Sequence, residues 1–527
     1  MNASPILHLV LLLPVMAGLA PAGSVEDRED GSTTIHVVVY RLPDPSRPDA
    51  ITRADVAVLK EFTRRWSEGW DETLPDGLVK HHPSILEQRY KEKYKANPAR
   101  YGKHNWGRVQ IELEQFRPRR KPPEGVSITD AARMAIEAGD APDILYVNFR
   151  QSHAHIRKGL LYPLDKPSDG YFAAMTEEEK QFRVHEKIWP VIKRRAAAVG
   201  KEHVWAMPFG GVLGKVMLYR KDLLDRAGVP HPTNDWTWED LLAACKKLTN
   251  RREGSYGIRL GMGRSESWFW TGFLWSAGGD AMLYDAKEDK WRAAFGSRAG
   301  AVALEFYTRL CTEHWVDADG RDRYGYAYKN VPDAGQMWER GQIGFYQAYI
   351  SERVFSTIDP DITGMVAMPL GYPDENGKRH RGAELNSRMH GLYARIKHPA
   401  VRDAAWEYIR FEGSKEAARI RTRIIVAAGK GRFMNPRYLR LFGYEDLVPL
   451  APKGWEEAFK IAIETGKPEP YGRNCLLIYC EMTKPINRAE NLGRFGNLPE
   501  DREARIAVMQ RLLKRGAATM DSSNRRP

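Results

Sequence analysis

The sequence predicts an α/β protein, and three observations support this fold class. In the first part of the chain, short apolar runs suited to buried strands alternate with segments whose apolar residues recur at helical spacing. The stretch Val204–Asp280 repeats this alternation and ends in a segment dense in tryptophan. The chain of 527 residues is 43% hydrophobic and 10% aromatic, which is typical of a folded globular protein and excludes the disordered class.

The first residues have the composition of an export signal. Ile6–Ala20 is apolar apart from His8 and is too short to span a bilayer comfortably. Ala20 and Ala22 supply the small residues that precede a cleavage site before Gly23. We therefore predict a cleaved signal peptide over residues 1–22 and a periplasmic mature protein. No cysteine lies near residue 22, so a lipid anchor is not expected, and no later segment is apolar enough to cross a membrane.

The mature chain begins with alternating strands and helices. We predict strands over Thr33–Tyr40, Trp106–Glu114 and Ala141–Val147, with helices over Val56–Trp70 and Ser127–Gly139 between them. This β-α-β-α-β order indicates parallel strands joined by right-handed crossovers. The polar residues 68–104 interrupt the order and are interpreted as an insertion.

The stretch 204–280 has clear start and stop signals. Val216–Tyr219 is a short apolar run that predicts a buried strand, and Asp222 is placed to cap the helix that follows. Thr237 begins a Thr-x-x-Asp motif, which predicts the N-cap of a second helix. Residues 265–280 then predict a helix rich in aromatic side chains.

Several ordered motifs resemble one protein family. They include Trp205–Phe209 in the form W-A-x-P-F, Leu218–Val229 in the form L-Y-R-K-D-L-L-x-x-A-G-V, Tyr256–Ile258, and Gly278–Asp280. Together with Gly139–Ile144, they resemble the extracellular solute-binding proteins of family 1, the sugar-binding receptors of ABC importers.

The resemblance implies the two-lobe periplasmic binding protein fold of type II, with discontinuous lobes around a hinged ligand cleft. On this basis we expect an N-terminal lobe from residues 33–210 and 345–395, and a C-terminal lobe from residues 211–344 and 396–518. Residues 519–527 are polar and are expected to form a disordered tail.

Two arguments nominate ligand-binding residues. In open α/β sheets, ligands bind beyond the carboxyl ends of the strands. Sugars need aromatic rings that stack on their C–H faces and polar side chains that replace water at their hydroxyls. The first argument selects Tyr40, Arg41, Asn148, Phe149, Phe209 and Gly210, and the second selects Glu266, Trp268, Trp270, Asp280, Tyr346, Tyr349 and Arg388.

Core packing is the alternative for each aromatic candidate. Trp275 is more readily explained as core, while Trp268 and Tyr349 are equally compatible with core and with ligand contact. Both of these positions resemble sugar-stacking aromatic positions of the family.

Catalytic and metal-binding patterns are weak. The sequence has no G-x-S-x-G, Walker or H-E-x-x-H motif, and the His81–His82 and His153–His155 pairs are interpreted as surface residues rather than metal ligands. We therefore expect no enzyme activity, no metal and no cofactor. The net charge of +13 allows an acidic ligand, but Lys and Arg are dispersed among Asp and Glu, which argues against nucleic acid.

The function predicted from the sequence is a monomeric receptor that captures a carbohydrate and delivers it to an ABC transporter permease in the inner membrane. Two alternatives remain at this stage. One is a hydrolase or lyase acting on acidic glycans, which would need a carboxylate pair or a Tyr/His/Arg cluster. The other is a sensory sugar-binding protein without transport.

Overall fold

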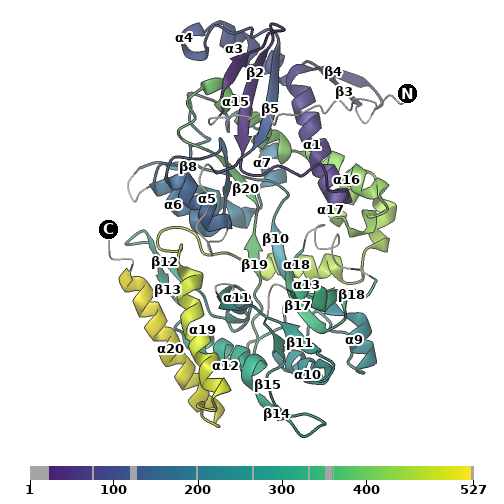
Figure 1. Cartoon of the computed structure of the whole chain (residues 1–527), viewed down its shortest axis with the longest axis vertical. Helices are drawn as coiled ribbons and strands as arrows, with labels where there is room; N and C mark the ends of the chain where they lie inside the picture. Colours follow the sequence, from purple (N-terminus) through teal and green to yellow (C-terminus); the bar gives the residue numbers. More distant parts are fainter. Residues whose placement is uncertain are drawn as a thin grey trace, which may run out of the picture. The chain divides into compact units, whose positions relative to one another are not determined.

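The computed structural model describes residues 23–523 except 74–75, 119–127, 197–199, 264–265, 330–332, 351–358 and 360. The predicted signal peptide, residues 1–22, lies outside the described residues. The chain divides into two compact units (Figure 1). The first comprises residues 1–42, 66–144 and 396–405, and the second comprises residues 43–65, 145–395 and 406–527. None of the helices within the described ranges is both long and apolar enough for a membrane span.

The first unit is built on β2 (Thr33–Val39), as the sequence predicts. This strand pairs in parallel with β5 (Val109–Gln115) and antiparallel with β1 (Val25–Asp27). Val39 also pairs in parallel with Ile144, the first residue of β6 (Ile144–Val147). The predicted parallel order is therefore confirmed, and the apolar residues of β2 are buried on both faces of the strand.

The predicted insertion has secondary structure of its own. It forms a hairpin of β3 (Trp70–Thr73) and β4 (Val79–His82), followed by the short helices α2 (Ile85–Arg89), α3 (Lys91–Lys95) and α4 (Pro98–Tyr101). The Tyr94 ring lies 4.5 Å from the Tyr101 ring and 4.7 Å from the Trp106 ring, centroid to centroid. This buried aromatic group explains how a polar segment folds. The unit also contains α5 (Ile128–Glu137).

The main sheet of the second unit is mixed. Its strand order is β16 (Ala327–Tyr328), β11 (Tyr256–Arg259), β17 (Ile343–Tyr349), β10 (Leu213–Arg220), β19 (Glu384–Asn386) and β21 (Lys467–Pro468), and β18 (Thr363–Val366) also pairs with β10. β10 is the long central strand because its apolar run, predicted from the sequence, is buried on both faces. The shorter β9 (Met207–Pro208) and β20 (Met389–Leu392) pair with each other.

Three hairpins complete the strands of the second unit. They are β7–β8 (Lys193–Arg195 and Glu202–Val204), β12–β13 (Met282–Asp285 and Lys290–Ala293) and β14–β15 (His314–Val316 and Asp322–Tyr324). The helices that begin in this unit are α1 (Ala50–Ser67), α6 (Phe149–Arg157), α7 (Glu177–Arg183), α8 (Trp189–Ile192), α9 (Lys221–Arg226), α10 (Trp238–Leu248), α11 (Glu266–Ser276), α12 (Arg298–Thr312), α13 (Ala334–Glu339), α16 (Lys415–Ala427), α17 (Pro436–Leu441), α18 (Trp455–Thr465), α19 (Ile478–Arg494) and α20 (Arg502–Ser523). Helix α15 (Pro399–Glu412) begins in the first unit and ends in the second.

The helix caps support one sequence prediction and correct another. Thr237 caps α10 in a capping box with Asp240, as the Thr-x-x-Asp motif predicts. Asp222 does not cap α9; the N-cap is Arg220, and Asp222 lies in the first turn. The Asp222 carboxylate instead binds the Arg220 guanidinium at 2.7 Å, so an ion pair takes the place of the predicted cap.

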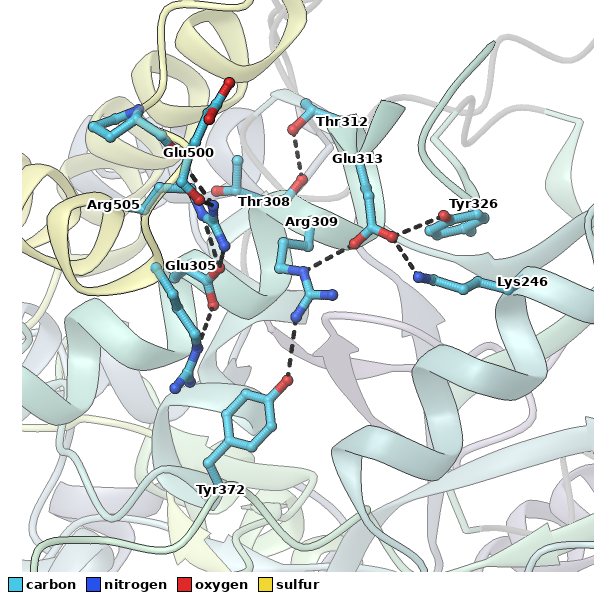
Figure 2. A network of polar contacts seen from close by, with 12 residues as sticks. Lys246, Glu305, Thr308, Arg309, Thr312, Glu313, Tyr326, Tyr372, Glu500 and Arg505 are labelled. Carbon is cyan, nitrogen blue, oxygen red and sulfur yellow. Dashed lines mark hydrogen bonds and ion pairs between the residues drawn. The ribbon is translucent and has the colours of Figure 1, made fainter. Parts of the chain in front are cut away.

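Buried charge attaches the last helix to the core (Figure 2). Glu305 of α12 has no exposed surface. Its carboxylate oxygens form ion pairs with the guanidinium nitrogens of Arg505 at 3.0 Å and Arg502 at 3.5 Å, both on α20. At the C-cap of the same helix, the Glu313 carboxylate binds Arg309, Lys246 and the Tyr326 hydroxyl. Helix α20 continues through Ser523 and buries Met520, so residues 519–523 are helical where the sequence predicted a disordered tail. The sequence prediction missed this part of the helix because α20 is anchored by an ion pair with Glu305, which lies far away in the sequence.

Candidate functional site

Two predicted ligand residues, Trp268 and Tyr349, lie together in the second unit. Trp268 is in the first turn of α11 and Tyr349 is the last residue of β17. Their ring centroids are 5.7 Å apart in an edge-to-face arrangement, and both side chains are half-buried.

A buried lysine sits against this aromatic pair. Lys215 of β10 lies opposite Tyr349 in the strand register. Its Nζ is 3.5 Å from the centroid of the Trp268 ring and 5.7 Å from that of Tyr349, and it donates to the Trp268 backbone carbonyl at 3.1 Å. The same atom lies 2.7 Å from Oε2 of Glu384, and neither side chain has any exposed surface. The cation therefore fixes the indole on one side.

Burial perturbs the groups of this cluster. Burial lowers the pKa of Lys215, and the negative charge of Glu384 opposes that shift. Burial also raises the pKa of Tyr349 well above its ordinary value, and Glu384 adds to the rise. The Tyr349 phenol is therefore neutral at physiological pH and accepts a hydrogen bond from Nδ2 of Asn386 at 3.3 Å. We call Lys215, Trp268, Tyr349, Glu384 and Asn386 the Lys215 cluster.

A second ion pair lies within electrostatic reach of the Lys215 cluster. Arg150 of α6 donates through Nε to Oε1 of Glu469 at 2.6 Å, and its Cζ lies 4.6 Å from the centroid of the Tyr479 ring. Burial raises the pKa of Glu469 to about 7, Arg150 opposes the rise, and the charge of Glu384 increases it. Asn148, another predicted site residue, accepts the backbone N–H of Arg150 and so caps α6.

A third group of predicted residues surrounds β9 and β20. The Arg388 guanidinium lies 5.6 Å from the centroid of the Phe209 ring, and that ring stacks on His390 at 4.2 Å. Gly210 adopts φ +82°, a conformation that favours glycine, and borders a small hollow. The other residues that line this hollow are Val212, Leu213, Ile350, Asn435, Tyr438, Trp455 and Phe459.

Burial excludes three predicted residues from direct ligand contact in this conformation. Phe149, Trp270 and Glu266 have no exposed surface. Phe149 and Trp270 are core side chains. Glu266 is a buried anchor: it pairs with Lys329 at 2.8 Å and accepts a hydrogen bond from the Tyr307 hydroxyl. Helical spacing could not separate Trp270 from Trp268, because the apolar residues of α11 are spread around the helix and form no single apolar face.

Four further predicted residues lie in other surroundings. Tyr346 packs its ring against Arg259, whose Cζ is 4.5 Å from the ring centroid. Asp280 forms an ion pair with Lys467 at 2.6 Å. Tyr40 and Arg41 belong to the first unit, directly after β2, where Tyr40 is half-buried and Arg41 is exposed.

The sequence interpretation missed the charged members of the site. Lys215 is the only charged residue between Leu213 and Tyr219, and a charge inside an otherwise apolar strand was the signal that could have identified it. No comparable signal marks Glu384, Arg150 or Glu469, because the ion-pair partner of each lies far away in the sequence.

Side chains suited to metal binding meet at one place in the described residues of the first unit. His36, Glu112 and Glu114 offer ligand atoms that all lie within 4.8 Å of one another. His36 Nδ1 is 2.7 Å from Glu114 and 3.6 Å from Glu112, and Arg28 pairs with Glu112. The predicted surface histidines differ in outcome. His81 pairs with Asp71, and His82 with Glu72. The surface prediction is wrong for His155, which is buried on α6.

Comparison with solved structures shows a shared fold at low sequence identity. The ABC substrate-binding protein Lmo0181 from Listeria monocytogenes, in complex with cycloalternan, has a TM-score of 0.58 at 16% identity and covers 93% of this chain and 98% of that chain. The GacH receptor of Streptomyces glaucescens, solved unliganded and with acarbose, has a TM-score of 0.55 at 15% identity, with 91% and 98% covered. Maltose-bound MalE3 of T. maritima has a TM-score of 0.51 at 18% identity, with 82% and 95% covered.

These likenesses confirm the α/β, two-lobe solute-binding fold of type II that the sequence predicts. No match was found among curated proteins. The family model described as "Bacterial extracellular solute-binding protein" matches residues 109–419, more than half of the chain. The chain therefore belongs to the bacterial extracellular solute-binding proteins.

Proposed function

We propose that the protein is an exported receptor that binds a carbohydrate at the Lys215 cluster and delivers it to the permease of an ABC importer. The observation that supports this most is the pairing of Trp268 with Tyr349. These two half-buried rings lie 5.7 Å apart at the end of one strand, with an amide beside them at Asn386. Rings can stack on the C–H face of a sugar, and the amide can bind a hydroxyl.

The ion pairs give this surface a fixed shape. The Lys215 ammonium lies against the face of the Trp268 ring and is itself fixed by its ion pair with Glu384. The indole therefore loses little conformational freedom when a ligand stacks on it. Arg150 and Glu469 are similarly fixed by each other. A rigid platform of this kind favours binding, because less conformational entropy is lost when the complex forms.

The likeness to solved receptors supports a sugar as ligand. Lmo0181 was solved with cycloalternan, and the cyclic α-maltosyl-1,6-maltose binding protein of Arthrobacter globiformis is a further structural neighbour, with a TM-score of 0.54. The family is one of binding proteins, which favours capture over catalysis. The hydrolase or lyase alternative predicts that a saccharide incubated with the protein is cleaved, and the sensory alternative predicts binding without transport.

A pair of tryptophan variants tests the proposed site. Trp268→Ala should weaken binding by about ten- to a hundredfold, because loss of a stacking platform costs about 1–3 kcal/mol. Its melting temperature without ligand should change much less than that of Trp275→Ala, the matched control. Trp275 is 3% exposed in the core, and loss of a buried tryptophan costs about 3–5 kcal/mol of stability.

The measurement is a thermal-shift screen with maltotriose, cellotriose, xylotriose and digalacturonate. Wild-type protein should melt at a higher temperature with at least one of them, and Trp268→Ala should lose most of that rise. Trp268→Phe retains a ring and should retain part of it. An unchanged ligand response in Trp268→Ala, together with a strongly lowered melting temperature of the free protein, would place Trp268 in the core and refute the site.

A further inference from the structure

Asp143 carries a buried carboxyl group that lacks a charged partner. It belongs to the first unit, lies directly before β6 and is 1% exposed. Its Oδ2 accepts the backbone N–H of Val38 at 2.8 Å and the backbone N–H of Gly23 at 3.1 Å. Among the described residues, no lysine, arginine or histidine forms an ion pair with it. A buried carboxylate normally has a cation beside it, because desolvation of the charge is costly.

The groups around Asp143 are neutral or negative. Burial raises the pKa of Asp143 to about 7, the two backbone N–H groups oppose this rise, and the negative charge of Glu114 on β5 adds to it. His36 of β2 pairs with that same Glu114 at 2.7 Å. Helix α15 contributes the apolar side chain of Val401. A positive charge next to Oδ2 would therefore stabilise the ionised carboxylate.

Backbone pairing holds Gly23 beside this carboxyl group. The carbonyl of Ser24 accepts the N–H of His36 at 2.8 Å, and β1, which starts at the next residue, pairs antiparallel with β2. β2 is the buried strand on which the first unit is built. The sheet therefore fixes the position of the Gly23 nitrogen relative to Asp143.

Close packing requires glycine at position 23. A Cβ on this residue would lie 2.4 Å from Oδ2 of Asp143, 2.4 Å from Cγ1 of Val401 and 2.8 Å from the carbonyl oxygen of His36. Gly23 does not have a positive φ, so packing rather than backbone conformation excludes other residues. Only a residue without a side chain brings its nitrogen this close to the carboxyl group.

Gly23 is also the residue that directly follows the cleavage site predicted from Ala20 and Ala22. Hydrolysis of the Ala22–Gly23 peptide bond by a signal peptidase consumes one water molecule. The hydroxyl group of the water joins the Ala22 carbonyl carbon, and the Gly23 nitrogen leaves as an amine that takes up protons to become an ammonium group. The ordinary pKa of such a group is about 7.7–8.0, and a neighbouring carboxylate raises it. The atom that donates a neutral N–H to Asp143 in the full chain thus gains a positive charge.

We propose that the first unit contains a binding site for the N-terminus that cleavage creates, in which the α-ammonium group of Gly23 forms a buried ion pair with Asp143. The ion pair supplies the missing cation and stabilises the pairing of β1 with β2. In the full chain the same carboxyl group has only neutral donors. Cleavage before Gly23 therefore makes the first unit more stable at neutral pH. This inference rests on the export step of the proposed function and not on its carbohydrate site.

The ion pair has a defined range of pH. The ammonium group opposes the rise in the pKa of Asp143, and the carboxylate raises the pKa of the ammonium group above its unfolded value. A group whose pKa is raised by folding contributes stability below its unfolded pKa and loses it as the pH rises through the folded pKa. The additional stability of the cleaved chain should therefore be present at pH 7 and disappear above about pH 9–10.

The experiment compares two chains that differ by one residue, one starting at Gly23 and the other at Ala22. Each is released from an N-terminal fusion by a protease that leaves no extra residue, and both contain every described residue. The chain starting at Ala22 also has an α-ammonium group, but it is displaced by one residue, about 3.8 Å, and the Gly23 nitrogen stays neutral. Hydrogen exchange of the β1 and β2 amides and thermal melting at pH 7 are the readouts.

The chain starting at Gly23 should melt at the higher temperature and should exchange these amides at least about tenfold more slowly. An opposite charge at this distance shifts a pKa by about one unit or more, and one unit is a tenfold change in the folding equilibrium. Asp143→Asn in both chains should abolish the difference. Asp76→Asn, at an exposed position of the same unit, is the matched control and should preserve it.

The pKa of the N-terminal amine gives a second readout that does not depend on a variant. The pH dependence of its acetylation, followed by peptide mass spectrometry, should give a pKa at least about one unit higher in the chain starting at Gly23 than in the chain starting at Ala22. This measurement decides the question even if Asp143→Asn does not fold.

Three results would overturn the proposal. The first is equal exchange and an equal amine pKa in the two chains. The second is a difference between the chains that persists in Asp143→Asn. The third is protein from the native host that begins at a residue other than Gly23. None of these results depends on a saccharide, so the ligand screen at Trp268 tests the carbohydrate site separately.

Discussion

The buried pair of Lys215 and Glu384 gives the sharpest stability prediction. The two side chains have no exposed surface, and Nζ lies 2.7 Å from Oε2. Glu384→Gln keeps the shape of the side chain but leaves the lysine charge without its counter-ion. Removal of one partner of a buried ion pair costs about 3–5 kcal/mol. For a unit as large as the second one, roughly 1–2 °C are lost per kcal/mol, so the melting temperature should fall by at least about 3 °C.

Calorimetry of four proteins separates the pair from its surroundings. Glu384→Gln should melt lowest. The double variant Lys215→Met/Glu384→Leu should recover most of the loss, because apolar replacement of both partners is often neutral or stabilising. Glu456→Gln is the control: its carboxylate pairs with Arg440 at the same kind of distance, 2.8 Å, but both side chains are about half exposed, so it should cost less than about 1 kcal/mol.

The reasoning would be refuted if Glu384→Gln melted within a degree of the wild type, or if the double variant melted lower than the single one. The first result would mean that water solvates the charge of Lys215 once its counter-ion is removed. The second would mean that packing, rather than charge, dominates at this position.

Three further predictions follow from other parts of the chain. Burial raises the pKa of Asp143 to about 7, so the folded first unit of the full chain favours the protonated carboxyl. The stability of this unit should therefore fall as the pH rises from about 4 to about 7. Urea unfolding at these pH values should show that Asp143→Asn removes this dependence. Glu305→Ala leaves Arg505 without its buried partner, so hydrogen exchange should become faster along α20, while Glu503→Ala at an exposed site should change it little. If the chain is exported, protein from its native host should begin near Gly23; an intact Met1 in a cytoplasmic fraction would contradict export.

Much of the fold could be predicted because its signals are local. The apolar runs of β2 and β10, the Thr237 capping box and the parallel order around β2 all follow from side-chain periodicity and capping chemistry. Asp222 shows the limit of such signals. Its position in the sequence suits a cap, but the nearby Arg220 guanidinium binds the carboxylate first.

The candidate site could be predicted only in part, because its charges are paired across long distances in the sequence. Trp268 and Tyr349 were identified from their surroundings and their resemblance to family positions. Lys215 meets Glu384, and Arg150 meets Glu469, only once the chain has folded. Helical periodicity also failed within α11, since Trp268 and Trp270 are two residues apart and only the first is half-buried.

The central claim is that the protein binds a saccharide at Trp268 and Tyr349 and leaves it intact. Isothermal titration calorimetry of the purified chain with the best ligand of the trisaccharide and digalacturonate screen, followed by chromatography of the recovered sugar, tests this most directly. The account predicts saturable binding of one ligand per chain, at least tenfold weaker in Trp268→Ala, and recovery of the unaltered saccharide. Absence of binding by all of these sugars, or release of shorter products, would contradict it.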